Sequence, residues 1–239
     1  MPPFYVFPER GTFLKALCVS DKVVSWLYSP AVLTKARDVE VIFGCGDLPY
    51  YYLEYLVSML NIPLYYVHGN HDAEKEYTPS GEAITGPGGG MNLDGRVIEV
   101  NGMLVAGLQG SIRYKLEGSF QHTDLEMWMK VYRLIPKLLL NRIFKGRALD
   151  ILVTHSPPLG IHNGADHVHR GFKSFLWLMD TFKPRYLIHG HHHVYRQTEQ
   201  TVTLYQDTIV NNIYPYKILD IPSRRYQPAI SVNRRGSEK

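Results

Sequence analysis

The chain has 239 residues, of which 45% are hydrophobic and 20% are charged, the usage of an ordinary soluble globular protein. This composition is not typical of an intrinsically disordered chain, and the length allows one large domain or two small ones. The net charge of +4 is too small to indicate nucleic-acid binding by itself. Part of the basic excess lies in a tail from about residue 224, which we interpret as a solvated, frayed end.

The two cysteines, Cys18 and Cys45, each lie inside an apolar run that is typical of a strand. We therefore expect no disulfide framework and a reducing environment. The N-terminal residues 1–10 contain three prolines and are not expected to act as a secretion signal, and no apolar run approaches membrane-spanning length. We expect a cytoplasmic protein with no membrane partner.

In chain order, short apolar runs alternate with longer stretches that have helical spacing. The runs rich in β-branched and aromatic residues predict strands at 13–20, 39–43, 63–67, 97–100, 103–107, 151–154 and 185–188. Helices are predicted at 23–37, 49–61, 124–144 and 172–182, and Pro136 should kink or break the third. Strands that alternate with helices indicate a largely parallel sheet, with ligand sites at the carboxyl ends of the strands.

Three segments differ from this alternation. Asn101-Gly102 between two strands predicts a hairpin with a type I′ turn, so the sheet should be mixed. Segments 201–205 and 216–221 predict further antiparallel strands. Residues 77–92, rich in glycine and proline, predict a loop beside a site, although no Lys-Ser or Lys-Thr follows the glycine triplet as in a phosphate-binding loop. No repeat or linker is evident, and we predict a single domain.

Five predicted strands each end in side chains that can bind a metal. Because the carboxyl ends of parallel strands meet at one edge, these side chains should converge. Carboxylates and an amide combined with imidazoles suit manganese, iron or zinc better than calcium. Glycines before three of these positions allow a sharp backbone turn. The residues concerned are Asp21, Asp47, Asn70 with His71 and Asp72, His155, and His191 with His193.

The order Asp, Gly-Asp, Gly-Asn-His-Asp, His and Gly-His-x-His resembles the calcineurin-like metallophosphoesterase family over residues 13–193. The resemblance implies a four-layer α/β/β/α sandwich with two mixed sheets and two divalent metal ions at their edge. It implies that Asp47 bridges the ions, that Asp21 and His193 bind the first, and that Asn70, His155 and His191 bind the second. It also implies phosphoester hydrolysis by a hydroxide that bridges the metals, with His71 as leaving-group acid and Asp72 orienting His71.

The first motif departs from the family pattern. The family has Asp-x-His, whereas this chain has Asp21-Lys22-Val23, so the first metal loses one imidazole. Another group could replace the missing imidazole, the first metal could bind weakly, or catalysis could be lost. Because the other predicted ligands are all present, the first two possibilities are favoured. A histidine-rich loop at 161–169 offers His167 and His169 as contacts to substrate or as auxiliary ligands, the alternative being an ordinary polar loop.

These features predict a metal-dependent phosphodiesterase or phosphatase that acts on a small phosphoester. Nucleic acid is not favoured as a partner because no basic stripe is visible. Two alternatives remain open: a catalytically weakened protein that uses the same fold as a binding or scaffold module, and a nuclease. The sequence does not choose the substrate, the metal, the type of ester or the oligomeric state.

Overall fold

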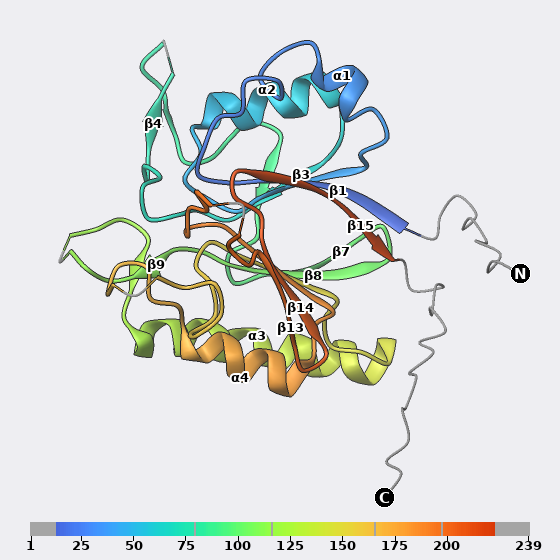
Figure 1. The fold of residues 1–239 in the computed structure, drawn as a ribbon, viewed down its shortest axis with the longest axis vertical. Helices are drawn as coiled ribbons and strands as arrows, with labels where there is room; N and C mark the ends of the chain where they lie inside the picture. The colour runs from blue at the N-terminus through green and yellow to red at the C-terminus, as the bar shows by residue number, and fades with distance from the viewer. Residues whose placement is uncertain (1–12, 79, 116, 165, 197, 223–239) are drawn as a thin grey trace, which may run out of the picture.

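The computed structural model describes residues 13–78, 80–115, 117–164, 166–196 and 198–222. Two β-sheets stack face to face, and helices cover the outer side of each, so that the layers follow the order α/β/β/α (Figure 1). The predicted fold class is therefore confirmed. The basic tail predicted from about residue 224 lies outside the described residues.

The first sheet has the strand order β15-β1-β2-β3-β6. Strands β1, β2, β3 and β6 run parallel, and β15 pairs antiparallel with β1 at one edge. Helices α1 (Val32–Lys35) and α2 (Tyr50–Leu60) pack on its outer face over an apolar cluster that includes Leu17, Ile42 and Leu56. The strands are β1 (Phe13–Val19), β2 (Val41–Gly44), β3 (Leu64–Tyr66), β6 (Gly90–Asn92) and β15 (Tyr216–Pro222).

The second sheet has the order β13-β14-β12-β11-β8-β7, with four parallel strands in the middle and an antiparallel strand at each edge. Asn101 and Gly102 have φ of 46° and 78°, which confirms the predicted hairpin turn between β7 and β8. The strands are β7 (Val97–Val100), β8 (Met103–Leu108), β11 (Ile151–Thr154), β12 (Tyr186–His189), β13 (Val202–Tyr205) and β14 (Thr208–Asn212).

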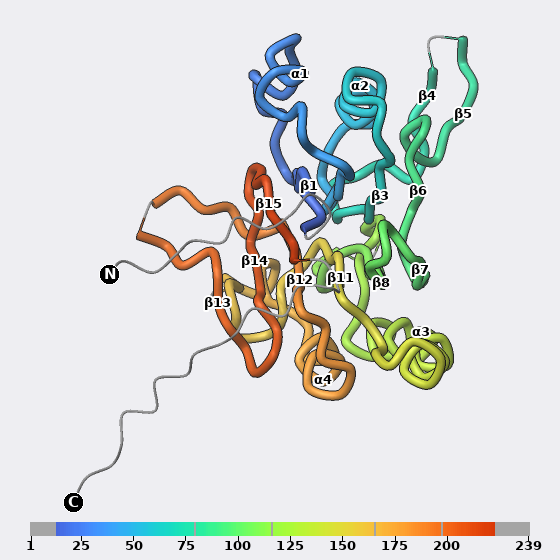
Figure 2. Tube along the Cα trace, turned by 90° about the vertical axis from the view of Figure 1, so that its right-hand side faces the viewer, coloured from blue at the N-terminus to red at the C-terminus, as the bar shows by residue number. Residues whose placement is uncertain are grey.

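Helices α3 (Asp124–Lys145) and α4 (Lys173–Phe182) cover the outer face of the second sheet. A second viewing direction places α1 and α2 on one side of the strands and α3 and α4 on the other (Figure 2). Two small two-stranded sheets complete the described elements: β4 (Glu76–Tyr77) with β5 (Ala83–Ile84), and β9 (Ser111–Ile112) with β10 (Gln121–His122).

The core between the two sheets is built from the inward side chains of both, among them Phe43, Val105 and Val153. Strands buried on both faces have few polar positions, which explains the nearly continuous apolar runs in the sequence. Cys18 and Cys45 are free thiols inside this layer, and burial raises the pKa of both. They are therefore unreactive at neutral pH.

Two local predictions were wrong, and of the two effects expected of Pro136 the break does not occur. The segment predicted as a helix at 23–37 is helical only from Val32 to Lys35, because Pro30 disfavours helical geometry in Ser29, whose hydroxyl bonds to the backbone of Trp26 and Ala31 instead. The predicted loop at 77–92 contains β5 and β6, and β6 extends the first sheet. No break occurs at Pro136, since α3 continues unbroken over 22 residues from a capping box at Thr123.

Candidate metal centre

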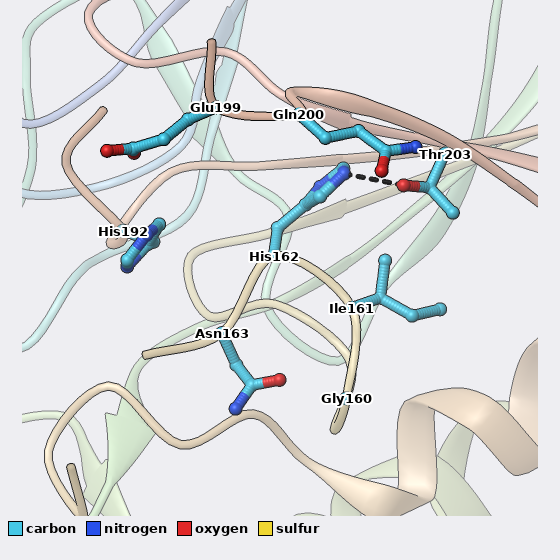
Figure 3. Close-up of a pocket in the computed structure, with 8 residues that line it drawn as sticks. All are labelled: Gly160, Ile161, His162, Asn163, His192, Glu199, Gln200 and Thr203. Atoms are coloured by element: carbon cyan, nitrogen blue, oxygen red, sulfur yellow. Dashed lines mark hydrogen bonds between the residues drawn. The ribbon is translucent and has the colours of Figure 1, made fainter. Parts of the chain in front are cut away.

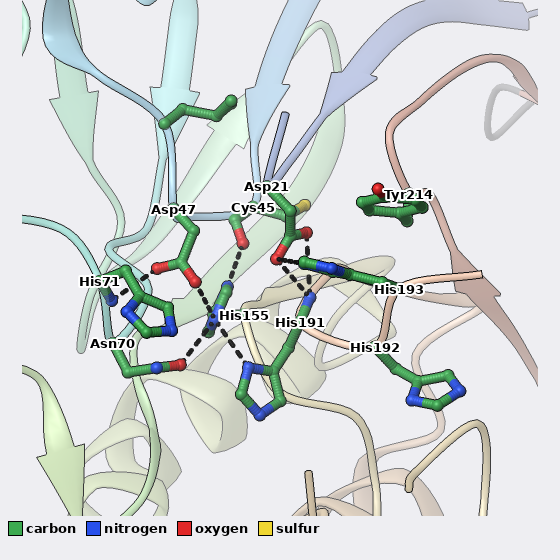
Figure 4. Close-up of polar contacts among 12 residues, drawn as sticks. Asp21, Cys45, Asp47, Asn70, His71, His155, His191, His192, His193 and Tyr214 are labelled. Atoms are coloured by element: carbon green, nitrogen blue, oxygen red, sulfur yellow. Dashed lines mark hydrogen bonds and ion pairs between the residues drawn. The ribbon is translucent and has the colours of Figure 1, made fainter. Parts of the chain in front are cut away.

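The predicted metal ligands follow the strands that the sequence suggested. Asp21, Asp47 and Asn70 come after β1, β2 and β3 of the first sheet, and His155 and His191 come after β11 and β12 of the second. Their side chains point toward one another at the shared edge of the two sheets, with His71 and His193 beside them (Figure 4). The structure thus places together all the residues for which the resemblance implied a metal-binding role.

Four of these side chains enclose one point. His155 Nε2 lies 3.1 Å from Asn70 Oδ1, 3.3 Å from Asp47 Oδ2 and 3.1 Å from His191 Nδ1. The potential ligand atoms of Asp47, His155 and His191 all lie within 4.8 Å of one another. A carboxylate, an amide oxygen and two imidazoles make up a donor set that manganese, iron and zinc accept.

Backbone carbonyl groups fix the imidazole tautomers in this cluster. His155 Nδ1 donates to the carbonyl oxygen of Cys45 at 2.7 Å, and His191 Nε2 donates to that of Val168 at 3.0 Å. In the neutral rings, the nitrogens that face each other, His155 Nε2 and His191 Nδ1, therefore carry lone pairs. Lone pairs and oxygens aimed at one point repel unless a positive charge lies between them, so these residues fit a bound cation.

The electrostatics of the cluster agree with this fit. Burial opposes protonation of His155, but the charge of Asp47 and the bond between them outweigh burial and raise the pKa of His155. Burial also opposes ionisation of Asp47, yet His155 lowers the pKa of that carboxyl. Burial first, and the His155 charge second, lower the pKa of His191. The surroundings thus stabilise positive charge at the centre of the cluster.

Asp21 and His193 form a second, smaller group. His193 Nε2 lies 3.5 Å from Asp21 Oδ1, and the Asp21 carboxylate accepts from the backbone N–H of His191 at 3.1 Å. The His193 ring stacks on Tyr214 with the centroids 4.5 Å apart, and its Nδ1 lies 3.0 Å from the Tyr195 hydroxyl. Val23 packs against the apolar cluster under α1 and α2, so it offers no donor to this group.

The backbone around the site is held in unusual conformations. Asp21, Asp47 and His191 have φ of 61°, 56° and 64°, a region that residues with a Cβ rarely adopt. Such strain persists only where the surroundings enforce it, and it is frequent at functional sites. Gly69 is needed for a separate reason, because a Cβ there would overlap the Asp47 carboxylate.

Asp72 and Tyr114 support the cluster from outside. The Asp72 carboxylate accepts from the backbone N–H groups of Asp47 at 3.0 Å, Leu48 at 2.9 Å and Gly69 at 2.8 Å. It thereby ties the loops after β2 and β3 together, while its implied action on His71 stays a prediction. Tyr114 was not predicted: its hydroxyl accepts from Asn70 Nδ2 at 3.1 Å, which turns Asn70 Oδ1 toward His155.

Replacing Asp72 by Asn is expected to loosen the site. The amide keeps one acceptor and turns an NH₂ group toward backbone donors, so we expect a loss of about 1–3 kcal/mol in the free energy of unfolding. Metal affinity should fall by about 10- to 100-fold, the usual effect of removing a group that orients ligands. Thermal unfolding and metal titration of the variant measure both, with the exposed Asp38→Asn as control. Unchanged metal affinity would contradict the bracing role.

The histidines of the loop at 161–169 lie in different surroundings, and only some of them are near the proposed ligands. His162 Nε2 lies 2.8 Å from the Thr203 hydroxyl (Figure 3), and its Nδ1 lies 3.1 Å from Nε2 of the buried His189, so His162 bonds to residues outside the proposed ligand set. His167 Nε2 donates to the carbonyl oxygen of Arg113 at 3.2 Å. His169 bonds through Nδ1 to Asp166 at 2.8 Å, and its ring centroid lies 5.2 Å from that of His191. Of the two histidines predicted as auxiliary, His169 is the one beside the proposed ligands.

One cavity reaches the site at His193, and a second lies next to it and shares His192 and Glu199 in its wall. The first, of about 550 Å³, reaches His193 and is also lined by Asp166, His169 and Tyr195. The second, of about 360 Å³, extends past His162 to Gln200 and Thr203 (Figure 3). The side chain of His192, the residue between the two proposed ligands His191 and His193, points away from Asp21 and His193 (Figure 4).

The fold and the arrangement of the candidate ligands are those expected of a metal-dependent phosphoester hydrolase. The family model for calcineurin-like phosphoesterases matches residues 29–195, well over half of the chain, and the chain belongs to this family. No curated protein matches it.

Two solved structures show the same fold at low sequence identity. One is 15% identical with a TM-score of 0.58, and the match covers 87% of this chain and 95% of the other. The second, TT1561 of Thermus thermophilus, is 17% identical with a TM-score of 0.54, and the match covers 84% of this chain and 89% of the other. A more distant match is the calcineurin-like phosphoesterase YfkN from Bacillus subtilis, 14% identical over 88% of this chain and 89% of its own, with a TM-score of 0.43.

Proposed function

We propose that this protein hydrolyses a small phosphoester, as a phosphodiesterase or phosphatase, with two divalent ions of manganese, iron or zinc. The observation that carries the proposal is the convergence of Asp47, Asn70, His155 and His191 on one point, with the tautomers of both imidazoles fixed for metal binding. Asp21 and His193 lie beside them with a second set of donors.

The chain's own residues have distinct tasks in this scheme. Asp47, Asn70, His155 and His191 would hold one ion, and Asp21, Asp47 and His193 the other. When bound, such a pair lowers the pKa of a water molecule and neutralises the phosphate oxygens. His71 has an exposed side chain next to Asp47 and Asn70, where it can protonate the departing oxygen (Figure 4).

The cavities support a small substrate. Their volumes, about 550 and 360 Å³, fall in the range of small-molecule sites. Their walls carry the carboxylates Asp166 and Glu199 and, among the residues that line them, no lysine or arginine. A polyanionic strand would be repelled by such walls, which favours a small phosphoester over nucleic acid.

The test is turnover of metal-free protein supplied with manganese, iron, zinc or magnesium. Bis(p-nitrophenyl) phosphate and p-nitrophenyl phosphate distinguish diesterase from monoesterase activity, and elemental analysis counts the ions. We expect turnover with a transition metal and two ions per chain. Bound ions without turnover of either compound would favour the binding-module alternative, and salt-sensitive DNA binding with DNA cleavage would favour a nuclease.

His169→Ala is expected to weaken substrate binding. The His169 ring lies between Asp166 and His191 in the wall of the larger cavity. Its loss should raise KM by about tenfold and leave kcat and metal content nearly unchanged, the signature of a contact made equally in ground and transition states. His167→Ala, whose ring bonds to the Arg113 carbonyl, is the control. A fall in metal content would show instead that His169 completes the coordination, and no change in either variant would leave the loop without a role.

A further inference from the structure

Helix α3 has an apolar face on the side that does not contact the protein. Its inner face buries Met127, Val131, Leu134 and Leu138 against the second sheet. A surface helix normally presents polar side chains on the opposite side. Here the exposed positions include large apolar side chains along the whole helix: Leu125, Met129, Tyr132, Leu139, Leu140, Ile143 and Phe144.

These positions form a continuous stripe. Five of them recur every three or four residues together with the exposed Pro136, so they lie above one another on one side of the helix, and Leu139 and Phe144 flank them: the five are Leu125, Met129, Tyr132, Leu140 and Ile143. Ile143 and Phe144 are 72% and 79% exposed. Single exposed apolar residues are ordinary, but a contiguous stripe of them indicates a contact surface. We call this stripe the outer face of α3.

Beyond the first turn of α3, which contains Asp124 and Glu126, the charges beside the outer face have a single sign. Residues 130–149 contain six basic residues and no acidic one. Three of the six form ion pairs within the protein, Lys130 with Asp94, Lys145 with Glu99 and Arg147 with Asp150. The other three, Arg133, Lys137 and Arg142, are exposed and form no ion pair among the described residues. The outer face is therefore apolar with a rim of free positive charge.

Aromatic side chains stand at the margin of the same surface. The rings of Trp128 and Tyr132 on α3 lie 5.6 Å and 5.8 Å from that of Trp177 on α4, and all three are at least partly exposed. Tryptophan and tyrosine prefer the boundary between a bilayer and water, because their rings are apolar and their N–H or O–H groups remain hydrated.

We propose that the outer face of α3 docks on the surface of an anionic lipid bilayer. A helix that lies in the membrane interface combines apolar side chains with lysine and arginine beside them, as this face does. The anionic headgroups would pair with Arg133, Lys137 and Arg142, and Ile143 and Phe144 would enter the boundary of the acyl chains. The proposal does not depend on the enzymatic function proposed above.

A second copy of the chain fits this face less well. Residues 134 and 135 are the middle of α3, so a two-fold antiparallel pairing would bring Arg133 and Lys137 close to their own counterparts. The acidic residues at the start of the helix could not relieve this repulsion freely, because Asp124 and Glu126 already pair with Arg170 and Arg113. An anionic bilayer surface, by contrast, would attract Arg133 and Lys137 and would bring no two positive charges together.

Docking of this kind needs no membrane-spanning segment. In the described part of the chain, no helix combines the length and the apolar character needed to cross a bilayer. The expectation of no membrane partner rested on that criterion, which a helix lying in the interface need not meet. Helices α3 and α4 form the outermost layer on this side of the molecule (Figure 1), and none of the proposed metal ligands belongs to either.

The test is binding of the full chain to vesicles of phosphatidylcholine alone or mixed with phosphatidylserine. We expect co-sedimentation with the mixed vesicles, weaker binding in high salt, and a blue shift of tryptophan fluorescence from Trp128 and Trp177. Arg133→Gln, Lys137→Gln and Arg142→Gln together should lower the partition coefficient about 100-fold. Ile143→Ser with Phe144→Ser should lower it by about tenfold or more.

Leu204→Ser is the matched control, since Leu204 on β13 is 71% exposed and lies outside this face. All substituted side chains are exposed, so the variants should keep the fold, which circular dichroism checks. Binding by both α3 variants at the wild-type level would overturn the proposal. A failure of the wild type to bind either kind of vesicle would also overturn it. If the wild type is then a dimer in analytical ultracentrifugation, and Ile143→Ser with Phe144→Ser dissociates that dimer, the outer face of α3 binds a second copy of the chain. Phosphoesterase turnover plays no part in these outcomes.

Discussion

Asp47→Asn is expected to lose both bound ions and turnover together. Asp47 is the proposed ligand that the two ions share, and its Oδ2 lies 3.3 Å from His155 Nε2 while Oδ1 accepts from the backbone N–H of His71 at 2.8 Å. An amide at this position removes the negative charge and turns an NH₂ group toward the cations. We expect turnover to fall by more than about a thousandfold, because groups that act as one unit are lost together.

Elemental analysis and turnover of the Asp47→Asn protein measure the two effects in one preparation. Asp38→Asn is the control, since Asp38 is an exposed partner of Arg37 at 3.5 Å and lies away from the site. Circular dichroism shows whether the variant keeps its fold. Turnover that survives in Asp47→Asn at the wild-type rate would mean that the metal centre has been placed on the wrong residues.

The position of the site could be predicted because its ligands follow strands directly. Asp47 and His155 each come after an apolar run, and a parallel sheet brings such positions to one edge whatever their separation in sequence. The pairing of the strands was not needed for this inference. A mixed order of strands would still have placed the same residues at the carboxyl ends.

Residues that support the ligands from other elements could not be predicted in this way. Tyr114 follows β9, which belongs to neither large sheet, and its contact with Asn70 depends on the path of the loop between β9 and β10. Val168 acts through its backbone carbonyl, which its side chain does not reveal. The contacts of Val23 could not be predicted either. The sequence shows that an imidazole is missing at this position, and the structure shows that the valine packs against the apolar cluster under α1 and α2.

Periodicity also failed where a helix has two apolar sides. The apolar run Leu138-Leu139-Leu140 does not show by itself which side chains cover the sheet, and in the structure Leu138 is buried while Leu139 is 46% exposed. An apolar residue one position beyond a buried one is read as part of the same face when the opposite face is assumed to be polar. The same assumption concealed the outer face of α3.

His71→Ala is expected to lower turnover without loss of metal. The alanine keeps the backbone N–H that donates to Asp47 at 2.8 Å, so the bridging carboxylate keeps its orientation. The imidazole is exposed at the edge of the site, and no ligand contact depends on its ring among the described residues. Removal of a general acid costs about 10²- to 10⁴-fold in rate, and we expect kcat to fall within that range.

The leaving group separates acid catalysis from other roles of His71. A p-nitrophenolate departs without protonation, whereas an alkoxide needs a proton, so His71→Ala should slow an alkyl phosphoester much more than the p-nitrophenyl ester of the same phosphate. His167→Ala, with its ring on the Arg113 carbonyl, should slow both substrates equally or not at all. An equal loss for both leaving groups in His71→Ala would show that the imidazole binds the phosphate instead of donating a proton. Loss of metal would show that it holds the site together, since a proton donor at the edge of the cluster contributes nothing to metal affinity.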